Sequence, residues 1–377
     1  MEESGNFSGQ TYTSGNSELS TGEKITCIGL NVILMVLIVV GNGLLLFAII
    51  KAKELKRSSR IFLVSLTVAD LFVGLVVIPV RVVPQIIGIS IGSTWFLSDR
   101  FCETLYFLEI FAIGASVLAI LALSIERYLA VEMPLRFRSM LTSCRAFTVV
   151  ACSWLASLCT ASIFVILSVV NEDRFFLVFD GSSSLCVIKG LNWLTRFMFF
   201  NFIIVFLLIP FCVTFLASIR ILHIVKNHTG FQKQAPNPSD CNSACRQTSS
   251  ASGAKRLPQA QRTGNGVCRG LCKRFLDNKK ALVTVLIVTL SYSASSVPFV
   301  VCVLYMEFSP YSVDQFLVEL AKLSLFTSCF INVIVYTIRN RAFRGSAKRL
   351  LFRLFPVRLR CNTVRRHPVR SQADNLS

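Results

Sequence analysis

Long apolar runs alternate with short polar segments over most of this 377-residue chain. A bilayer core about 30 Å thick needs about 20 apolar residues for each helical span, and only a helix or a closed barrel satisfies the backbone amides in lipid. We therefore predict an all-α membrane protein, a seven-transmembrane helix bundle. The predicted spans are approximately residues 26–50, 61–84, 103–125, 146–169, 197–222, 281–306 and 315–338.

The polar segments divide the chain into three parts. Residues 1–24 lack the cationic start and apolar core of a signal peptide, so we expect the first span to act as the targeting signal. We expect residues 1–24 to form an extracellular N-terminus ahead of a bundle over residues 25–338. Within the bundle, residues 227–272 are rich in Ser, Gly, Gln and Pro and predict a disordered cytoplasmic loop. Residues 339–377 begin with apolar and basic side chains that separate onto two helical faces, which predicts a short amphipathic eighth helix and then a cytoplasmic tail.

Basic residues gather in alternate connecting segments, such as "KAKELKRSSR" at residues 51–60. Because basic loops stay on the cytoplasmic side, we predict a multi-pass plasma-membrane protein with its N-terminus outside. The mean hydropathy of +0.63 agrees with this class. The net charge of +19 then reflects membrane topology, and we expect no nucleic-acid partner. Asn6 begins the outer-side sequon "NFS", a candidate glycosylation site.

Three of the fourteen cysteines are candidates for covalent chemistry. Cys102 and Cys186 both lie on the predicted outer side, where oxidising conditions allow them to pair. Cys361 follows the predicted eighth helix and is either a palmitoylation site or a free tail thiol. The three histidines lie in predicted cytoplasmic segments, and the sequence shows no nucleophile–base or metal-ligand constellation. We therefore do not expect an enzyme.

Several short motifs follow one another along the spans. They are Asn42 of "GN", Asp70 of "LTVAD", Trp95 and Cys102, Glu126-Arg127-Tyr128 at the end of the third span, Pro134-Leu135 of "PLRF", Trp154, Pro210, Pro298, and Asn332 with Tyr336 in "NVIVY". In this order they resemble the rhodopsin-like (class A) G-protein-coupled receptors, from residue 25 to about residue 352. The resemblance implies a receptor that couples an extracellular ligand to a heterotrimeric G protein.

The resemblance gives roles to polar residues and cysteines. Asp70, Ser116 and Asn332 correspond to a pocket that holds an allosteric Na⁺ in the resting state, and a purely structural polar cluster is the alternative. We expect no other cofactor or metal. Cys102 and Cys186 correspond to the disulfide that ties the third span to the second outer loop.

At the inner end, the resemblance implies a switch in which Arg127 engages the G protein after release from Glu126. The implied coupling residues are Glu126, Arg127, Tyr128, Pro134, Leu135 and Tyr336. Four positions depart from the family pattern, with Ser296 in place of Trp, Val333 in place of Pro, Ser218 in place of Tyr, and Asn278 (beside Asp277) in place of an acid. The missing acid predicts higher basal activity, and the other changes predict weaker ligand-driven activation.

Glu109 is an acid inside the apolar third span. It precedes Arg127 by eighteen residues, which is five turns at 3.6 residues per turn, so both face the bundle. Amine receptors of the family hold an aspartate here that pairs with the ligand's ammonium. A buried carboxylate needs a cation, and the sequence offers either a ligand ammonium or Lys322 in the seventh span.

Aromatic residues complete the predicted ligand site. Phe299 supplies a wall suited to a cation, and Phe206 and Phe326 stand where other receptors of the family carry polar groups. We expect a small, amine-like cationic ligand. The alternatives are a short peptide ligand, or a weakly signalling or decoy membrane protein.

Overall fold

The computed structural model describes most of the predicted bundle. The described residues are 19–51, 56–91, 98–133, 136–170, 177–180, 185–188, 197, 200–217, 219–220, 223, 283–284, 286–305, 308 and 313–339. Several predictions fall outside these ranges. They are the glycosylation of Asn6, the roles of Pro134, Leu135, Ser218, Asp277 and Asn278, the disordered loop 227–272, the eighth helix and Cys361.

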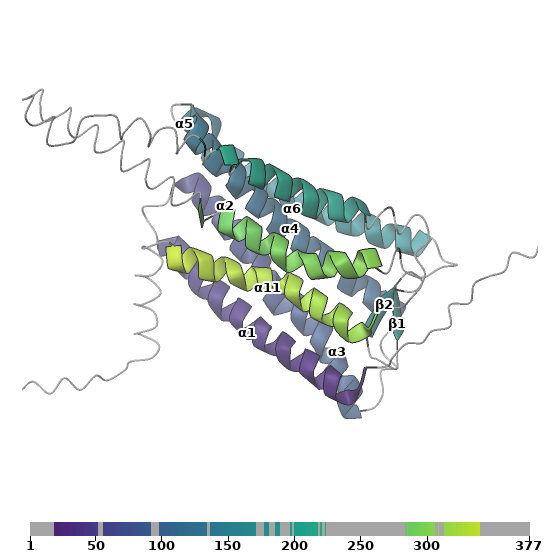
Figure 1. The fold of residues 1–377 in the computed structure, drawn as a ribbon. Coiled ribbons are helices and arrows are strands. Elements are labelled where there is room, and N and C mark those ends of the chain that lie inside the picture. The colour runs from purple at the N-terminus through teal and green to yellow at the C-terminus, as the bar shows by residue number, and fades with distance from the viewer. Residues whose placement is uncertain are drawn as a thin grey trace, which may run out of the picture.

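Seven helices among the described residues are long and apolar enough to cross a membrane, which confirms the predicted bundle (Figure 1). The named helical elements are α1 (Thr21–Lys51), α2 (Arg57–Phe72), η1 (Val73–Val77), α3 (Ile78–Ile91), α4 (Asp99–Glu132), α5 (Phe137–Met140), α6 (Ser143–Val170), η2 (Ile203–Leu208) and α11 (Gln315–Arg339), and Figure 1 labels all of them except η1 and η2. Elements α2, η1 and α3 form one span, Arg57–Ile91. The fifth span is Phe200–Ala217, which contains η2, and the sixth is Leu286–Tyr305.

The second span contains a π-helical turn, η1, which the sequence analysis did not predict. A π turn accommodates an extra residue, so the side chains beyond it are turned by roughly one residue's step of 100° relative to a continuous α-helix. In α3, Arg81, Val82 and Gln85 are buried as a result of this setting, while Val83 faces outward. The span continues through Pro84 to Ile91, seven residues beyond the predicted end.

Close approaches of α1 hold the bundle together on one side. A Cβ at Gly74 in η1 would lie 2.9 Å from methyl carbons of both Ile38 and Val39, so only glycine allows this contact. A Cβ at Gly41 would lie 3.2 Å from a methyl carbon of Val333 in α11. Val333 thus packs tightly against α1, and α11 continues as α-helix through the position where the family pattern has proline.

Two short strands, β1 (Leu177–Asp180) and β2 (Leu185–Ile188), form an antiparallel hairpin in which Leu177 pairs with Ile188. The hairpin lies at one end of the bundle and α5 at the other, and we call these the hairpin end and the α5 end (Figure 1). Cys186 of β2 is joined by a disulfide to Cys102 in the first turn of α4. The predicted Cys102–Cys186 disulfide is therefore present.

The disulfide makes a first testable prediction. Cys102→Ala or Cys186→Ala should each lower delivery of the protein to the cell surface severalfold, because losing such a cross-link costs about 2–5 kcal/mol. The double variant should be no worse than either single one, since both remove the same bond. Surface labelling of intact cells measures the effect, with the free thiol variant Cys159→Ala as control. Normal delivery of the single variants would contradict the prediction.

Candidate functional site

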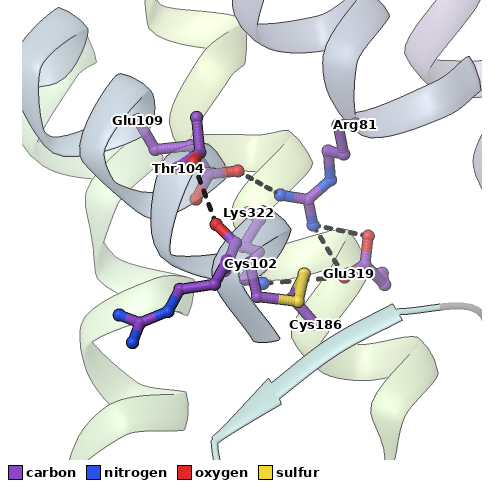
Figure 2. Close-up of a disulfide and its surroundings, with 8 residues drawn as sticks. Arg81, Cys102, Thr104, Glu109, Cys186, Glu319 and Lys322 are labelled. Carbon is purple, nitrogen blue, oxygen red and sulfur yellow. Dashed lines mark hydrogen bonds and ion pairs between the residues drawn. A yellow bond between two sulfur atoms is a disulfide. The ribbon is translucent and has the colours of Figure 1, made fainter. Parts of the chain in front are cut away.

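Four charged side chains meet in the apolar interior toward the hairpin end. Arg81 of α3 donates from Nη1 to Oε1 of Glu109 of α4 at 2.6 Å. Its Nη2 donates to both carboxylate oxygens of Glu319 of α11, each at 2.6 Å. The Nζ of Lys322, one turn along α11, lies 3.7 Å from Oε1 of Glu319. Figure 2 shows Arg81 between the two carboxylates, and we call these four side chains the charge cluster.

Burial makes the pairing of these charges obligatory. The exposed fractions are 5% for Arg81, 7% for Glu109, 4% for Glu319 and 7% for Lys322. A buried ion without a partner costs several kcal/mol, and the cluster contains two cations and two anions, so its formal charges cancel. Glu319 and Lys322 are three residues apart and therefore share one face of α11. The cluster thus fixes the relative rotation of α3, α4 and α11.

The sequence analysis considered Lys322 or a ligand ammonium as the partner of Glu109, and the structure shows a third group, the guanidinium of Arg81. The ion pair of Glu109 is made with Arg81, and Lys322 instead lies beside Glu319 and 5.6 Å from the centroid of the Tyr106 ring. Arg81 and Glu319 were overlooked, although both lie inside predicted spans, where every ionisable side chain is a candidate functional residue. The same rule that singled out Glu109 would have found them.

A small cavity lies beside the cluster, with a volume of about 30 Å³. This is room for about two water molecules. Glu109 and Lys322 line it, together with Tyr106, Phe164, Phe202 and Phe299. Arg81 and Glu319 are not among its described lining residues. The cavity therefore faces one carboxylate, one ammonium and an aromatic wall.

The other predicted ligand residues lie close to this cavity. Phe326 lines it. Phe206 does not line it, but its ring packs against that of Phe202 with 5.3 Å between centroids. The structure thus brings Glu109, Lys322, Phe299 and Phe326 together and places Phe206 behind the aromatic wall. Their role in ligand binding stays a prediction.

Asp70, Ser116 and Asn332 lie together in the middle of the bundle. The Ser116 hydroxyl donates to Oδ1 of Asp70 at 2.9 Å, and the Asn332 amide donates to Oδ2 at 3.1 Å. Both partners are neutral, and the Asp70 carboxylate is fully buried. A buried carboxylate with neutral partners and a nearby hydroxyl oxygen fits a small monovalent cation. That these residues bind Na⁺ stays a prediction.

At the α5 end, Glu126 is held by two helices. Its Oε2 lies 3.4 Å from Nη2 of the adjacent Arg127. Its Oε1 accepts hydrogen bonds from the hydroxyl of Ser59 at 2.6 Å and that of Ser58 at 3.3 Å, both in the first turn of α2. The sequence analysis missed these serines, because their contact with Glu126 depends on how α2 and α4 pack. They restrain the acid that neighbours Arg127.

Three further positions from the sequence analysis are described by the structure. Tyr336 is buried in the main apolar core, and Tyr128 is half-buried on α4. Ser296, which stands where the family has Trp, is buried and donates to the carbonyl of Tyr292 at 2.8 Å. The serine hydroxyl is therefore satisfied within its own helix.

Comparison with known proteins identifies the family. The model of the 7 transmembrane receptor (rhodopsin family) matches residues 41–336 of this chain. The chain therefore belongs to this family, and it is a class A G-protein-coupled receptor and a multi-pass membrane protein, as the motifs predicted. Members of this family are receptors and not enzymes.

Its relatives differ in the ligands that their names give. A QRFP-like peptide receptor of Branchiostoma floridae is 25% identical over 93% of this chain and 82% of its own length. The human 5-hydroxytryptamine receptor 2C is 24% identical over 90% of this chain and 73% of its own length. An adenosine receptor A2b of Gallus gallus is 40% identical, over 36% of this chain and 37% of its own length. These likenesses support the receptor class and leave the type of ligand open.

The serine contacts at Glu126 generate a second prediction. Ser59→Ala should raise basal G-protein activation by at least about tenfold, because it removes a charge-assisted hydrogen bond, a type worth about 1.5–3 kcal/mol. Ser58→Ala should have a smaller effect, since its contact is 0.7 Å longer than that of Ser59. Signalling is normalised to surface expression, with Ser153→Ala on an exposed face of α6 as control. Unchanged basal activity in Ser59→Ala would refute a restraining role.

Proposed function

We propose that this receptor resides in the plasma membrane and converts the binding of a small extracellular ligand into activation of a heterotrimeric G protein. The observation that carries the proposal is α4, which holds Glu109 in the cavity wall and the Glu126–Arg127 pair at the α5 end on one unbroken helix. Five helical turns separate the two sites, which is about 27 Å. A shift or rotation of α4 at one end of the bundle is therefore transmitted to the other end.

The hairpin end is the extracellular end in this proposal. The disulfide at Cys102 supports it, because disulfides persist in oxidising compartments. Lys51 and Arg57, at the ends of α1 and α2, and Arg145, in the first turn of α6, lie at the opposite end, where the positive-inside rule expects cytoplasm. The N-terminus is then outside, and Arg127 faces the G protein.

The ligand in this proposal carries an ammonium group that docks at Glu109. The carboxylate lies in a wall with Tyr106 and Phe299, whose rings attract cations. The incoming ammonium competes with Arg81 for Glu109, and this competition is the step that couples binding to the bundle. An agonist activates because it binds the state with a loosened Arg81–Glu109 pair better than the resting state.

A peptide ligand is the second candidate. The likeness to a QRFP-like peptide receptor over most of both chains favours it. A small ligand is preferred because the cavity presents a single carboxylate and a single ammonium, from Glu109 and Lys322, within an aromatic wall. The intact Glu126-Arg127-Tyr128 motif favours a signalling receptor over a decoy.

Coupling to the G protein is tested at Arg127. Arg127→Ala should reduce basal and ligand-stimulated nucleotide exchange by at least about tenfold at unchanged surface expression, because truncating one partner of a charged contact costs about 2–5 kcal/mol. Purified G protein with receptor-containing membranes provides the measurement. Arg145→Ala, an exposed basic side chain at the same end, is the control. Full exchange in Arg127→Ala would exclude its proposed role.

The ammonium contact is tested at Glu109. Glu109→Gln removes one anion from the charge cluster and one partner from Arg81. Basal exchange should rise, and any ammonium-bearing agonist should lose at least about tenfold in potency. Washed membranes are assayed with a panel of biogenic amines and amino acids, with Glu132→Gln on the exposed face of α4 as the matched control. An agonist that keeps its potency in Glu109→Gln would show that it binds elsewhere.

A further inference from the structure

The two cavity-facing charges have unequal and incomplete bonding. Glu109 uses Oε1 for Arg81, and within the described residues its Oε2 has no hydrogen-bond donor. Lys322 has three ammonium protons, but the structure gives it a carboxylate at 3.7 Å and an aromatic ring at 5.6 Å. A distance of 3.7 Å exceeds the range of a hydrogen bond. One acceptor and one ammonium therefore face the cavity with bonding capacity to spare.

The other half of the charge cluster is complete without a ligand. The Nη2 of Arg81 donates to both carboxylate oxygens of Glu319, each at 2.6 Å. Hydrogen bonds between two charged groups are roughly twice as strong as those between neutral groups. Neither residue lines the cavity in the described structure. The bonding that a ligand can add therefore lies at Glu109 and Lys322.

Charge balance restricts what the cavity accepts. The cluster contains two positive and two negative groups, all nine-tenths or more buried. A ligand with a single positive charge would leave the site with one uncompensated cation, and a ligand with a single negative charge would leave one uncompensated anion, and both are costly in an apolar interior. A ligand with one charge of each sign keeps the site neutral and supplies a partner to both cavity-facing groups.

We propose that the ligand is a zwitterion, an amino acid-like molecule whose ammonium binds Glu109 and whose carboxylate binds Lys322. Its side chain is apolar or aromatic, because Tyr106, Phe164 and Phe202 form the rest of the wall. This inference rests on the proposed function, and it adds Lys322 as the residue that selects for the carboxylate. Simple amines bind through Glu109 alone, and more weakly.

The test uses ligands that differ only in charge. Full-length receptor in lipid nanodiscs is incubated in amino acid-free buffer with phenylalanine, 2-phenylethylamine or 3-phenylpropionate. The zwitterion 4-amino-3-phenylbutyrate is added as a probe with more widely spaced charges. Binding is measured as the ligand-induced shift in thermal unfolding, which grows with ligand concentration over Kd. One of the two zwitterions should bind at least about tenfold more tightly than the amine and the acid.

Two variants assign the two contacts. In Lys322→Gln, affinity for the zwitterion should fall to that of the amine, while affinity for the amine is unchanged or higher. In Glu109→Gln, affinity for the zwitterion should fall to that of the acid. Lys51→Gln and Glu132→Gln make the same chemical changes at exposed positions and should leave all four affinities unchanged. For each variant, the unfolding temperature with ligand is compared with that of the same variant without ligand. A general loss of stability in a variant therefore does not change the measured shift.

Nucleotide exchange on purified G protein is measured in the same samples. Equal affinity for the amine and the zwitterions, or no binding by either zwitterion, would overturn the inference. The proposed function would survive that result if Arg127→Ala still abolished basal exchange. Zwitterion binding that depends on Lys322, without any exchange that depends on Arg127, would support the inference and refute the proposed function.

Discussion

The contact of Arg81 with two carboxylates is the interaction on which the hairpin end of the bundle depends. A guanidinium buried among apolar helices is tolerated only with anions at hydrogen-bonding distance, and Arg81 obtains them from α4 and α11. Its three short contacts therefore lock three helices in one mutual rotation. These contacts also shape the cavity. Glu109 is held by Arg81 of α3, and Lys322, which does not pair with Glu109, lines the cavity.

The lock in turn depends on the π turn in the second span. Arg81 follows η1 by four residues, so its direction is set by the extra residue that the turn accommodates. Gly74 within η1 lets α1 approach closely enough to support the irregular segment. A continuous α-helix over the same residues would turn Arg81 away by roughly one residue's step. The geometry of the charge cluster is thus decided by a backbone irregularity several residues before Arg81.

Hydropathy was enough to predict the seven spans, because lipid allows few alternatives to a helix. The five-turn spacing of Glu109 and Arg127 was also readable, since α4 is a regular helix. The partner of Glu109 could not be predicted from the sequence, for two reasons. The π turn leaves no clear mark in the apolar pattern, and a charge on one helix does not reveal which neighbour it meets. Ser58 and Ser59 escaped notice for the same reason, as ordinary polar residues at the start of a span.

The second span and α4 are joined along their whole length. The three connections are Glu126 with Ser58 and Ser59, Asp70 with Ser116, and Arg81 with Glu109. Two of these side chains also bind α11: Asp70 accepts a hydrogen bond from Asn332, and Arg81 donates one to Glu319. In the proposed mechanism, a ligand that takes over the contact of Arg81 with Glu109 leaves the other two connections intact, so the second span and α4 stay together at the α5 end while their hairpin ends separate. On that proposal, Glu126 is released only if the shift of α4 also lengthens its contacts with Ser58 and Ser59, which makes these serines the last restraint on Arg127.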